Sequence, residues 1–386
     1  MATDFTVDRD TVKYVLNSSG DIASVAIDTP AIEYNTDGTY KGLLVEPAST
    51  NICLQSEDIN TTWSPTRATP TQDTEETPDG DTTNKYIKLV DDNSTGTGTA
   101  YVQQTITVSA NTKYTASVFL KADGLAFARL EANNYDGAAD GSQFFGLSGA
   151  GSLGTANNLD DSSIEAYPNG WYRCSITWTQ GAVDTSFNFR IYVADSISNV
   201  SVDLDGTSSI FVWGAQVEAS PIATSYIPTT TASVTRNKDD ISLTGASDLI
   251  GQSEGTLYAE VDWRKAGTSQ QILISINDGN FTNRINFISS SNTFSFAESG
   301  ISITESNGSY TGIQKFALAY ATNNSAGFRN GSQVGTTDTT CTISSGKTDI
   351  DIGQSFAASA QANMWIRAVA LYKTRLTDDQ LADLTS

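Results

Sequence analysis

Arg129, Glu131 and Asn133 occupy alternate positions of one segment, and a β-strand places alternate side chains on the same face. A guanidinium group, a carboxylate and an amide on one surface bond several hydroxyl groups at once, as recognition of a sugar requires. Aromatic rings supply the flat apolar surface on which a sugar ring lies. The residues predicted to form a glycan-binding site, on strands of one sheet, are Arg129, Asn133, Tyr135, Gln143, Trp178 and Arg190. In the alternative interpretation, these are outward polar side chains and one core tryptophan.

Residue types needed for most enzyme chemistry are missing. The chain has no histidine, which excludes Ser-His and Cys-His nucleophile pairs and imidazole metal ligands. Neither a G-x-S-x-G motif nor a P-loop is present. A glycosidase needs two carboxylates roughly 5–10 Å apart, and among 44 acidic residues such a pair arises by chance. We therefore predict that the protein is not an enzyme.

The three cysteines, Cys53, Cys174 and Cys341, lie far apart in the sequence and form no C-x-x-C pair. One of them is necessarily unpaired within a single chain, so neither a disulfide framework nor a zinc cluster is indicated. We predict that they are buried and act as small hydrophobic side chains.

The charge balance bears on the class of partner. The 386 residues include 22 Lys and Arg against 44 Asp and Glu, so the formal net charge is 22 − 44 = −22. A field of this sign repels nucleic acids and anionic membranes, and no basic stripe offsets it. No apolar run approaches the roughly 18 residues of a membrane span, and residues 1–5 (MATDF) do not resemble a secretory signal. We expect no nucleic-acid partner, no membrane insertion and no signal peptide.

Strand signals dominate the elements that must position these side chains. Segments rich in Val, Ile, Phe, Tyr and Thr are separated by turns of Gly, Asn, Asp and Ser. In 172–178 (YRCSITW) polar and apolar residues alternate, so one face of that strand lies in a core. With no long helix between strands, the predicted fold is all-β, with two antiparallel β-sandwich domains. A capping box at Thr377 and Gln380 predicts one short C-terminal helix.

Three parts are predicted along the chain. Residues 1–50 alternate short strands and turns that bury little core alone, so we expect an extended arm that lies on a neighbouring domain or chain. Residues 51–231 form the first sandwich, and the small polar segment 229–238 (TTTASVTRNK) marks its boundary with the second, 239–386. The acidic, turn-rich segment 73–81 (DTEETPDGD) is predicted to be a solvated loop.

An ordered run of motifs resembles a family of bacteriophage tail and virion-surface proteins. The motifs of the first part are 42–47 (GLLVEP), 50–52 (TNI), 55–58 (QSED), Trp63, 170–173 (GWYR), 212–218 (VWGAQVE), 224–230 (TSYIPTT) and 234–239 (VTRNKD). Those of the last part are 365–372 (WIRAVALY) and 376–381 (LTDDQL). The resemblance implies a jelly roll similar to carbohydrate-binding modules over 51–231. Over 239–386 it implies a concanavalin-A-like, or laminin-G-like, sandwich.

The resemblance also implies where ligands lie. Jelly rolls of this kind hold a structural Ca²⁺ between their first and last strands, and Glu57 and Glu218 occupy comparable positions here. Lectin-like sandwiches carry binding loops at strand ends, where this chain has 277–280 (NDGN) and 323–324 (NN). Asn, Asp and Gly are also the residues that turns require, so a turn remains the alternative at both places.

Together these observations predict a non-enzymatic structural protein on the surface of a bacteriophage virion, as capsid decoration, as a fibre or associated with the tail. It would be made in the host cytoplasm, dock to capsid or tail proteins through residues 1–50, and bind host-surface or environmental glycans. Oligomerisation stays open, and no long coiled coil predicts a fibre-type trimer. The alternative is a secreted bacterial protein that binds carbohydrate or accompanies a glycoside hydrolase.

Overall fold

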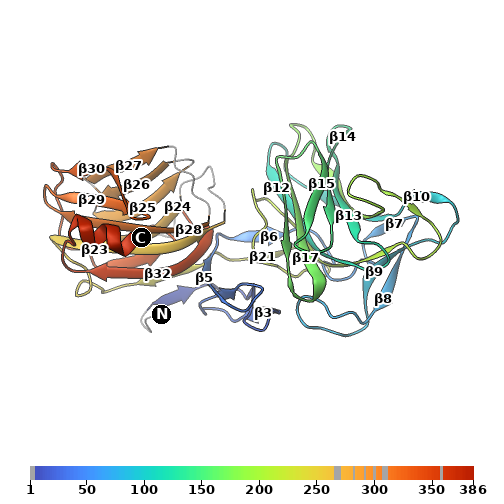
Figure 1. Ribbon diagram of the computed structural model, residues 1–386, viewed down its shortest axis with the longest axis horizontal. Coiled ribbons are helices and arrows are strands. Elements are labelled where there is room, and N and C mark those ends of the chain that lie inside the picture. Colours follow the sequence, from blue (N-terminus) through green and yellow to red (C-terminus); the bar gives the residue numbers. More distant parts are fainter. Residues whose placement is uncertain are drawn as a thin grey trace.

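The computed structural model describes residues 5–264, 271–280, 283–290, 293–298, 301–306, 312–356 and 360–386. Two β-sandwiches lie side by side along the long axis of the molecule, and the N-terminal arm lies between them (Figure 1). All the strand pairs described are antiparallel. The predicted all-β class, with antiparallel sandwiches and one short C-terminal helix, is therefore confirmed.

The first sandwich consists of two six-stranded sheets. One has the order β15 (Ser152–Asn157), β14 (Ala139–Gly146), β13 (Phe127–Asp136), β18 (Ser186–Ala194), β11 (Tyr101–Thr107) and β7 (Ser64–Thr66). The other has the order β16 (Asp161–Ala166), β17 (Trp171–Thr179), β12 (Lys113–Ala122), β20 (Ser209–Glu218), β9 (Lys85–Asp91) and β8 (Ala68–Asp73). A ribbon of β10 (Thr97–Thr99) and β19 (Ser201–Asp203) and the 3-10 turn Pro168–Gly170 complete it.

In the described residues, the second sandwich consists of two seven-stranded sheets. One has the order β1 (Thr6–Asp8), β22 (Asp240–Leu243), β31 (Asp349–Ile352), β24 (Gln271–Asn277), β25 (Arg284–Ser290), β26 (Thr293–Glu298) and β27 (Ile301–Ser306). The other has the order β30 (Ser332–Asp338), β29 (Ser325–Arg329), β28 (Gly312–Ala321), β23 (Glu254–Trp263), β32 (Met364–Tyr372), β5 (Tyr40–Val45) and β4 (Ile32–Tyr34).

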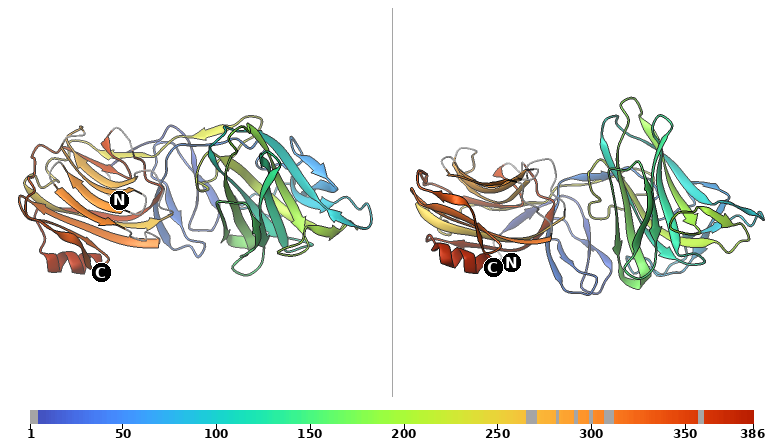
Figure 2. Two further views of the ribbon diagram at one scale, coloured as in Figure 1. Left: turned by 90° about the horizontal axis from the view of Figure 1, so that it is seen from above. Right: turned by 45° about the horizontal axis from the view of Figure 1, so that its top comes forward.

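The arm contributes to both sandwiches of its own chain, and Figure 2 shows it between them from two further sides. Its strands β1, β4 and β5 extend the sheets of the second sandwich. The hairpin of β2 (Lys13–Leu16) and β3 (Ile22–Val25) packs Leu16 and Ile22 against Trp171 and Trp213 of the first. The chain passes between the two sandwiches twice. The two connecting segments pair with each other as a short ribbon of β6 (Ser49–Asn51) and β21 (Val234–Arg236).

The core of each sandwich lies between its two sheets, as alternation requires. On β17, Tyr172, Cys174, Ile176 and Trp178 face the opposite sheet, while the intervening polar residues face outward. Burying such side chains contributes roughly 1.5–3 kcal/mol each. All three cysteines are buried and unpaired, as predicted from their spacing.

The helix α1 (Asp378–Thr385) begins at the predicted capping box. Thr377 accepts a hydrogen bond from the Gln380 amide, and the Gln380 side chain bonds the Thr377 amide in return. The helix packs Leu381 against the outer face of β28 and β29. In the described part of the chain, no helix is both long and apolar enough to cross a membrane.

The acidic loop 73–81 is not fully solvated, so that prediction is wrong in part. Thr77 and Pro78 are buried. The carbonyl of Pro78 accepts a hydrogen bond from the Ile22 amide, and that of Glu76 accepts one from the Trp171 indole. The loop therefore closes the cluster formed by the arm hairpin, because its backbone supplies acceptors that composition does not reveal.

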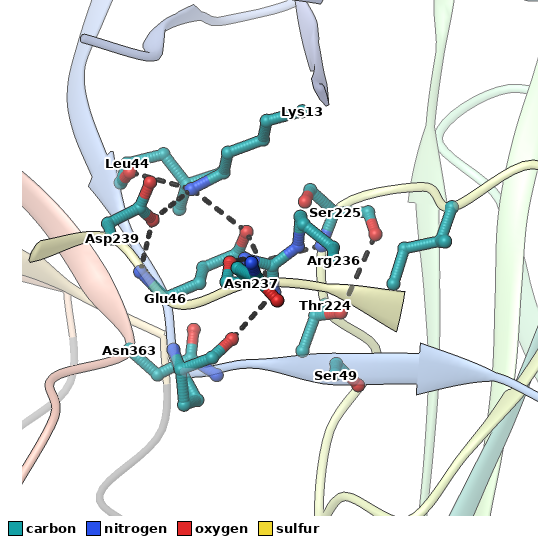
Figure 3. A network of polar contacts seen from close by, with 12 residues as sticks. Lys13, Leu44, Glu46, Ser49, Thr224, Ser225, Arg236, Asn237, Asp239 and Asn363 are labelled. Atoms are coloured by element: carbon teal, nitrogen blue, oxygen red, sulfur yellow. Dashed lines mark hydrogen bonds and ion pairs between the residues drawn. The ribbon is translucent and has the colours of Figure 1, made fainter. Parts of the chain in front are cut away.

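A buried network of charges, which we call the junction network, ties the arm to both sandwiches (Figure 3). Asp239 is 1% exposed and accepts from Arg9 at 2.8 Å and from the Lys13 ammonium at 2.6 Å. Glu46 is fully buried, with Lys13 at 3.1 Å and Arg236 at 3.6 Å. Arg264, at the end of β23, adds a further ion pair to Glu46.

Asp239→Asn tests this network. The amide cannot balance Arg9 and Lys13, and breaking a buried ion pair by removing one partner costs about 3–5 kcal/mol. We expect the free energy of unfolding, measured in urea near neutral pH, to fall by that amount. Asp160→Asn is the control, since Asp160 pairs with Lys113 at the surface and such pairs contribute at most about 1 kcal/mol. Equal losses in the two variants would contradict the role of the network.

Candidate functional site

The outer face of the sheet that contains β13 and β18 carries a continuous set of polar side chains. Apolar residues of β13 point into the core, so Arg129, Glu131 and Asn133 lie on the opposite face. The register sets Glu131 opposite Arg190 of β18, which lies opposite Gln103 of β11. We call this surface the β13–β18 face, and its members are Tyr101, Gln103, Thr105, Arg129, Glu131, Asn133, Asn188, Arg190 and Tyr192.

Glu131 is the centre of this face and is only 3% exposed. One carboxylate oxygen pairs with Arg129. The other accepts from the Tyr192 hydroxyl at 2.6 Å and lies 3.3 Å from Arg190. Burial and the adjacent charge of Glu131 raise the pKa of Tyr192, so its hydroxyl keeps its proton and donates. Arg190 also donates to the Gln103 amide oxygen at 2.8 Å.

A row of amides and a hydroxyl continues the network across the strands. Asn188 donates to Asn133 at 3.0 Å and accepts from Thr105 at 2.7 Å. Asn133 donates in turn to the Asp140 carboxylate at 2.6 Å. These bonds fix the amide orientations, so the remaining donors and acceptors at the surface are set before any ligand arrives.

Aromatic rings lie beside the charged groups. The rings of Tyr101 and Tyr192 are 4.6 Å apart between centroids. The guanidinium of Arg190 lies 5.1 Å from the Tyr101 ring, and that of Arg129 lies 5.1 Å from the Tyr192 ring and 5.6 Å from Phe144. The face thus combines rigid planar polar groups with π surfaces, which suits a polyhydroxylated ligand.

Three of the six predicted residues meet on this face. Arg129, Asn133 and Arg190 lie on the neighbouring strands β13 and β18 and belong to the connected network just described. Arg129 and Arg190 retain 18% and 21% side-chain exposure, so both remain accessible from solvent.

Tyr135 does not lie with them. Asn134 adopts a φ of 57°, and the pairing of β13 with β14 shifts at this point, so the alternation of faces breaks. The Tyr135 ring packs against the core between the sheets instead, and its hydroxyl donates to the Asn158 carbonyl at 3.1 Å.

Gln143 and Trp178 also lie elsewhere. Gln143 pairs with Leu130 and shares its inward side, where it is 2% exposed and donates to the Gly154 carbonyl at 2.9 Å. Trp178 lies on β17 of the other sheet, against the Phe187 ring in the core. The prediction that Trp178 shares a sheet with Arg190 is wrong, because strands rich in aromatic residues occur in both sheets.

Five members of the face were not predicted from the sequence: Tyr101, Gln103, Thr105, Asn188 and Tyr192. A usable signal exists for all five. Polar and apolar residues alternate along 187–192 (FNFRIY) and, except at the inward-facing Gln104, along 101–106 (YVQQTI). The more polar side of each segment faces outward. What the sequence lacks is the pairing of these two strands with each other.

The two acids predicted as calcium ligands have separate partners. Glu218 is fully buried and accepts from Gln216 at 2.7 Å and from the Thr224 hydroxyl at 2.7 Å. Glu57 accepts from the Tyr226 hydroxyl at 3.0 Å. Burial raises the pKa of Glu57, which weakens it as a ligand for a hard cation. The donors on Glu218 fill its two oxygens, so this pair does not fit a Ca²⁺ ion.

The second sandwich has a buried cluster of polar side chains around Asp351 of β31, on the side of the sheet that faces away from the core. Asn277, in the predicted loop motif 277–280, is the last residue of β24 and donates to Asp351 at 2.7 Å. Gly279 that follows has a φ of 77° and Asn323 has one of 56°, so both motifs contain the tight turns that the alternative interpretation foresaw. Burial, with the nearby charges of Asp240 and Asp349, raises the pKa of Asp351 to about 6.

Comparisons with known proteins give partial likenesses. No protein-family model matches the chain, and no curated protein sequence does. Solved structures similar to part of it include the CBM40 of the Ruminococcus gnavus IT-sialidase, with 15% identity over 36% of this chain and 86% of that one and a TM-score of 0.31. Another is domain 4 of AbnA, a GH43 extracellular arabinanase from Geobacillus stearothermophilus, in complex with arabinotriose. It has 12% identity over 43% of this chain and 82% of that one, with a TM-score of 0.32. Domains LG4-5 of the mouse laminin alpha1 chain have 10% identity over 70% of this chain and 85% of that one, with a TM-score of 0.27.

Asp351→Asn tests the buried carboxyl on the second sandwich. Since its pKa of about 6 lies above the usual 3.8, the folded state holds this proton more tightly than the unfolded chain does. The protonated carboxyl group of Asp351 therefore favours the folded state. This stabilisation is complete below about pH 4 and is lost as the pH rises through 6. Relative to the wild type, the variant should gain about 2–3 kcal/mol between about pH 4 and pH 7, measured by urea unfolding. A difference that stays constant over this range would contradict the assignment.

Proposed function

We propose that the protein binds carbohydrate through the β13–β18 face. The observation that carries this proposal is the network centred on Glu131, which holds two guanidinium groups in place beside the paired rings of Tyr101 and Tyr192. Such a surface offers fixed donors, fixed acceptors and π faces to a sugar at little ordering cost. Its open, sheet-like form favours an extended or branched glycan over a small molecule that needs enclosure.

The proposed activity is binding without catalysis. A glycosidase pairs a proton-bearing carboxyl with a second carboxylate at a distance of about 5–10 Å. Glu131 instead accepts from two guanidinium groups and a phenol. A carboxylate engaged in this way orients the arginines, and these then bond the ligand.

We further propose that the protein is displayed on a bacteriophage particle. The support is the ordered run of motifs that resembles phage virion-surface proteins, among them 42–47, 170–173 and 212–218. The net charge of −22 favours a protein that stays clear of the packaged genome. Its partners there would be capsid or tail proteins. A secreted bacterial carbohydrate-binding protein is the alternative.

Arg190→Gln and Tyr101→Ala test the binding face on a glycan array. Each removes a group that faces solvent beside Glu131, so we expect selective binding by the wild type and a loss of about tenfold or more in either variant. Tyr135→Phe is the matched control, because it removes a hydroxyl that bonds Asn158 away from this face. Binding that survives both changes, or an array without signal, would refute the proposal.

Labelling of particles tests the location. An antibody against the full chain should decorate intact phage particles, and quantitative mass spectrometry of purified particles should find the protein in stoichiometric copies. Its absence from purified particles, together with its recovery from a culture medium free of phage, would favour the secreted alternative.

A further inference from the structure

A cleft of about 400 Å³ lies between the two sandwiches, away from the β13–β18 face. One wall is the outer side of β16 and β17, with Arg173, Ser175 and Thr177 on its floor. The other wall comes from the second sandwich and the arm, where Trp365 and Lys41 lie. A volume of this size is within the range of small-ligand sites, about 300–1,000 Å³.

Arg173 on the floor of the cleft is a buried cation without a counter-charge. It is 8% exposed, and within the described residues no carboxylate approaches its guanidinium to 4.0 Å. Its Nη2 donates to the Ser117 hydroxyl at 3.2 Å, and its Nε has no hydrogen-bond partner. Glu165 faces Arg173 across β16 and β17 but pairs with Lys41 at 3.5 Å instead.

The imbalance at Arg173 points to an anion. A buried guanidinium that lacks a partner is costly, and its five donors form the planar fork that a carboxylate matches with two hydrogen bonds. The Phe119 ring, 5.4 Å from the guanidinium, holds it in place on the side of its own sheet. The guanidinium group lines the cleft, although its unbonded Nε is itself shielded, so a ligand there would meet its other nitrogens.

Hydroxyl groups and carboxylates surround this cation. The hydroxyls of Ser163 and Ser175 lie 2.7 Å apart across the strands, and Thr177 continues the row on β17. Asp161 and Glu165 stand on the exposed edge strand β16 at the rim. Acceptors of this kind bond the hydroxyls of a sugar, while they repel a ligand with many negative charges, such as a nucleic acid.

The opposite wall is rigid. Lys41 lies 3.8 Å and Arg264 5.0 Å from the centre of the Trp365 ring, and the indole donates to Glu33. Arg264 also donates to the Ala223 carbonyl of the first sandwich at 2.8 Å, so one side chain spans the base of the cleft. The cleft is therefore preformed, which lowers the cost of binding.

We propose that this cleft is a second ligand site and that it takes an acidic sugar residue, whose carboxylate pairs with Arg173 and whose hydroxyls bond the serine, threonine and rim carboxylates. This site does not depend on glycan binding at the β13–β18 face. It lies between the sandwiches, so its ligand would contact both of them.

The test compares two sugars that differ only at the acidic group. In calorimetric titrations of the full chain, methyl glucuronide should bind at least about tenfold more tightly than methyl glucoside, which has a hydroxymethyl group in place of the carboxylate. This comparison needs no variant, so it holds whatever a substitution does to folding. Equal binding of the two sugars, or no binding of either, would overturn the proposal, as would sulfate that competes as strongly as the glucuronide.

Arg173→Met tests whether Arg173 causes the preference for methyl glucuronide over methyl glucoside. The variant keeps the length of the side chain and should lose the difference between the two sugars, while its thermal midpoint without ligand should be unchanged or higher, since it removes an unpaired buried charge. Lys113→Met, at an exposed site of the same sheet, should keep the preference. A preference retained in Arg173→Met would overturn the assignment. A negative result here with a positive glycan array would leave the β13–β18 face intact as the binding surface.

Discussion

Two buried carboxylates, Glu46 and Asp239, hold the molecule together at the junction of its sandwiches. Burial alone would raise the pKa of Glu46, but Lys13, Arg236 and Arg264 hold it well below its usual range. The four cations, Arg9, Lys13, Arg236 and Arg264, come from the arm, from the connection between the sandwiches and from the end of β23, so the two carboxylates meet all their counter-charges only when the three parts are in place. Removing either carboxylate would leave uncompensated cations in a buried site, so the ion pairs favour this one arrangement of the three parts.

The same constraint sets the geometry of the cleft between the sandwiches. Arg264 ends in the junction network, bonds the Ala223 carbonyl of the first sandwich and lies against Trp365 of the second. The distance between the cleft walls therefore follows from one guanidinium whose position Glu46 dictates. A hydrophobic contact of similar area would hold the sandwiches together without fixing their orientation this closely, because apolar attraction has no preferred direction.

Local patterns in the sequence predicted the features that depend on residues close together in the chain. The all-β class, the capping box of α1 and the outward position of Arg190 all follow from spacing within one element. The prediction for Tyr135 failed because a single residue, Asn134, takes a positive φ and reverses the alternation. The junction network was out of reach for another reason. Arg9 and Asp239 are separated by 230 positions, and nothing near either residue encodes the pairing.

Coverage by the chain itself decides which sheet faces stay open to ligands. In the first sandwich, the arm hairpin and an apolar cluster around Trp171 and Trp213 cover part of the outer face of the sheet that contains β17. In the second, α1 covers the outer face at β28 and β29. The first sandwich thus keeps the outer face of its other sheet, which carries the network around Glu131, whereas Asp351, Asn277 and Ser275 on the other sheet of the second sandwich are buried. The cleft at Arg173 lies where the cover of the β17 sheet ends, so its polar floor is the part of that face that the arm leaves open.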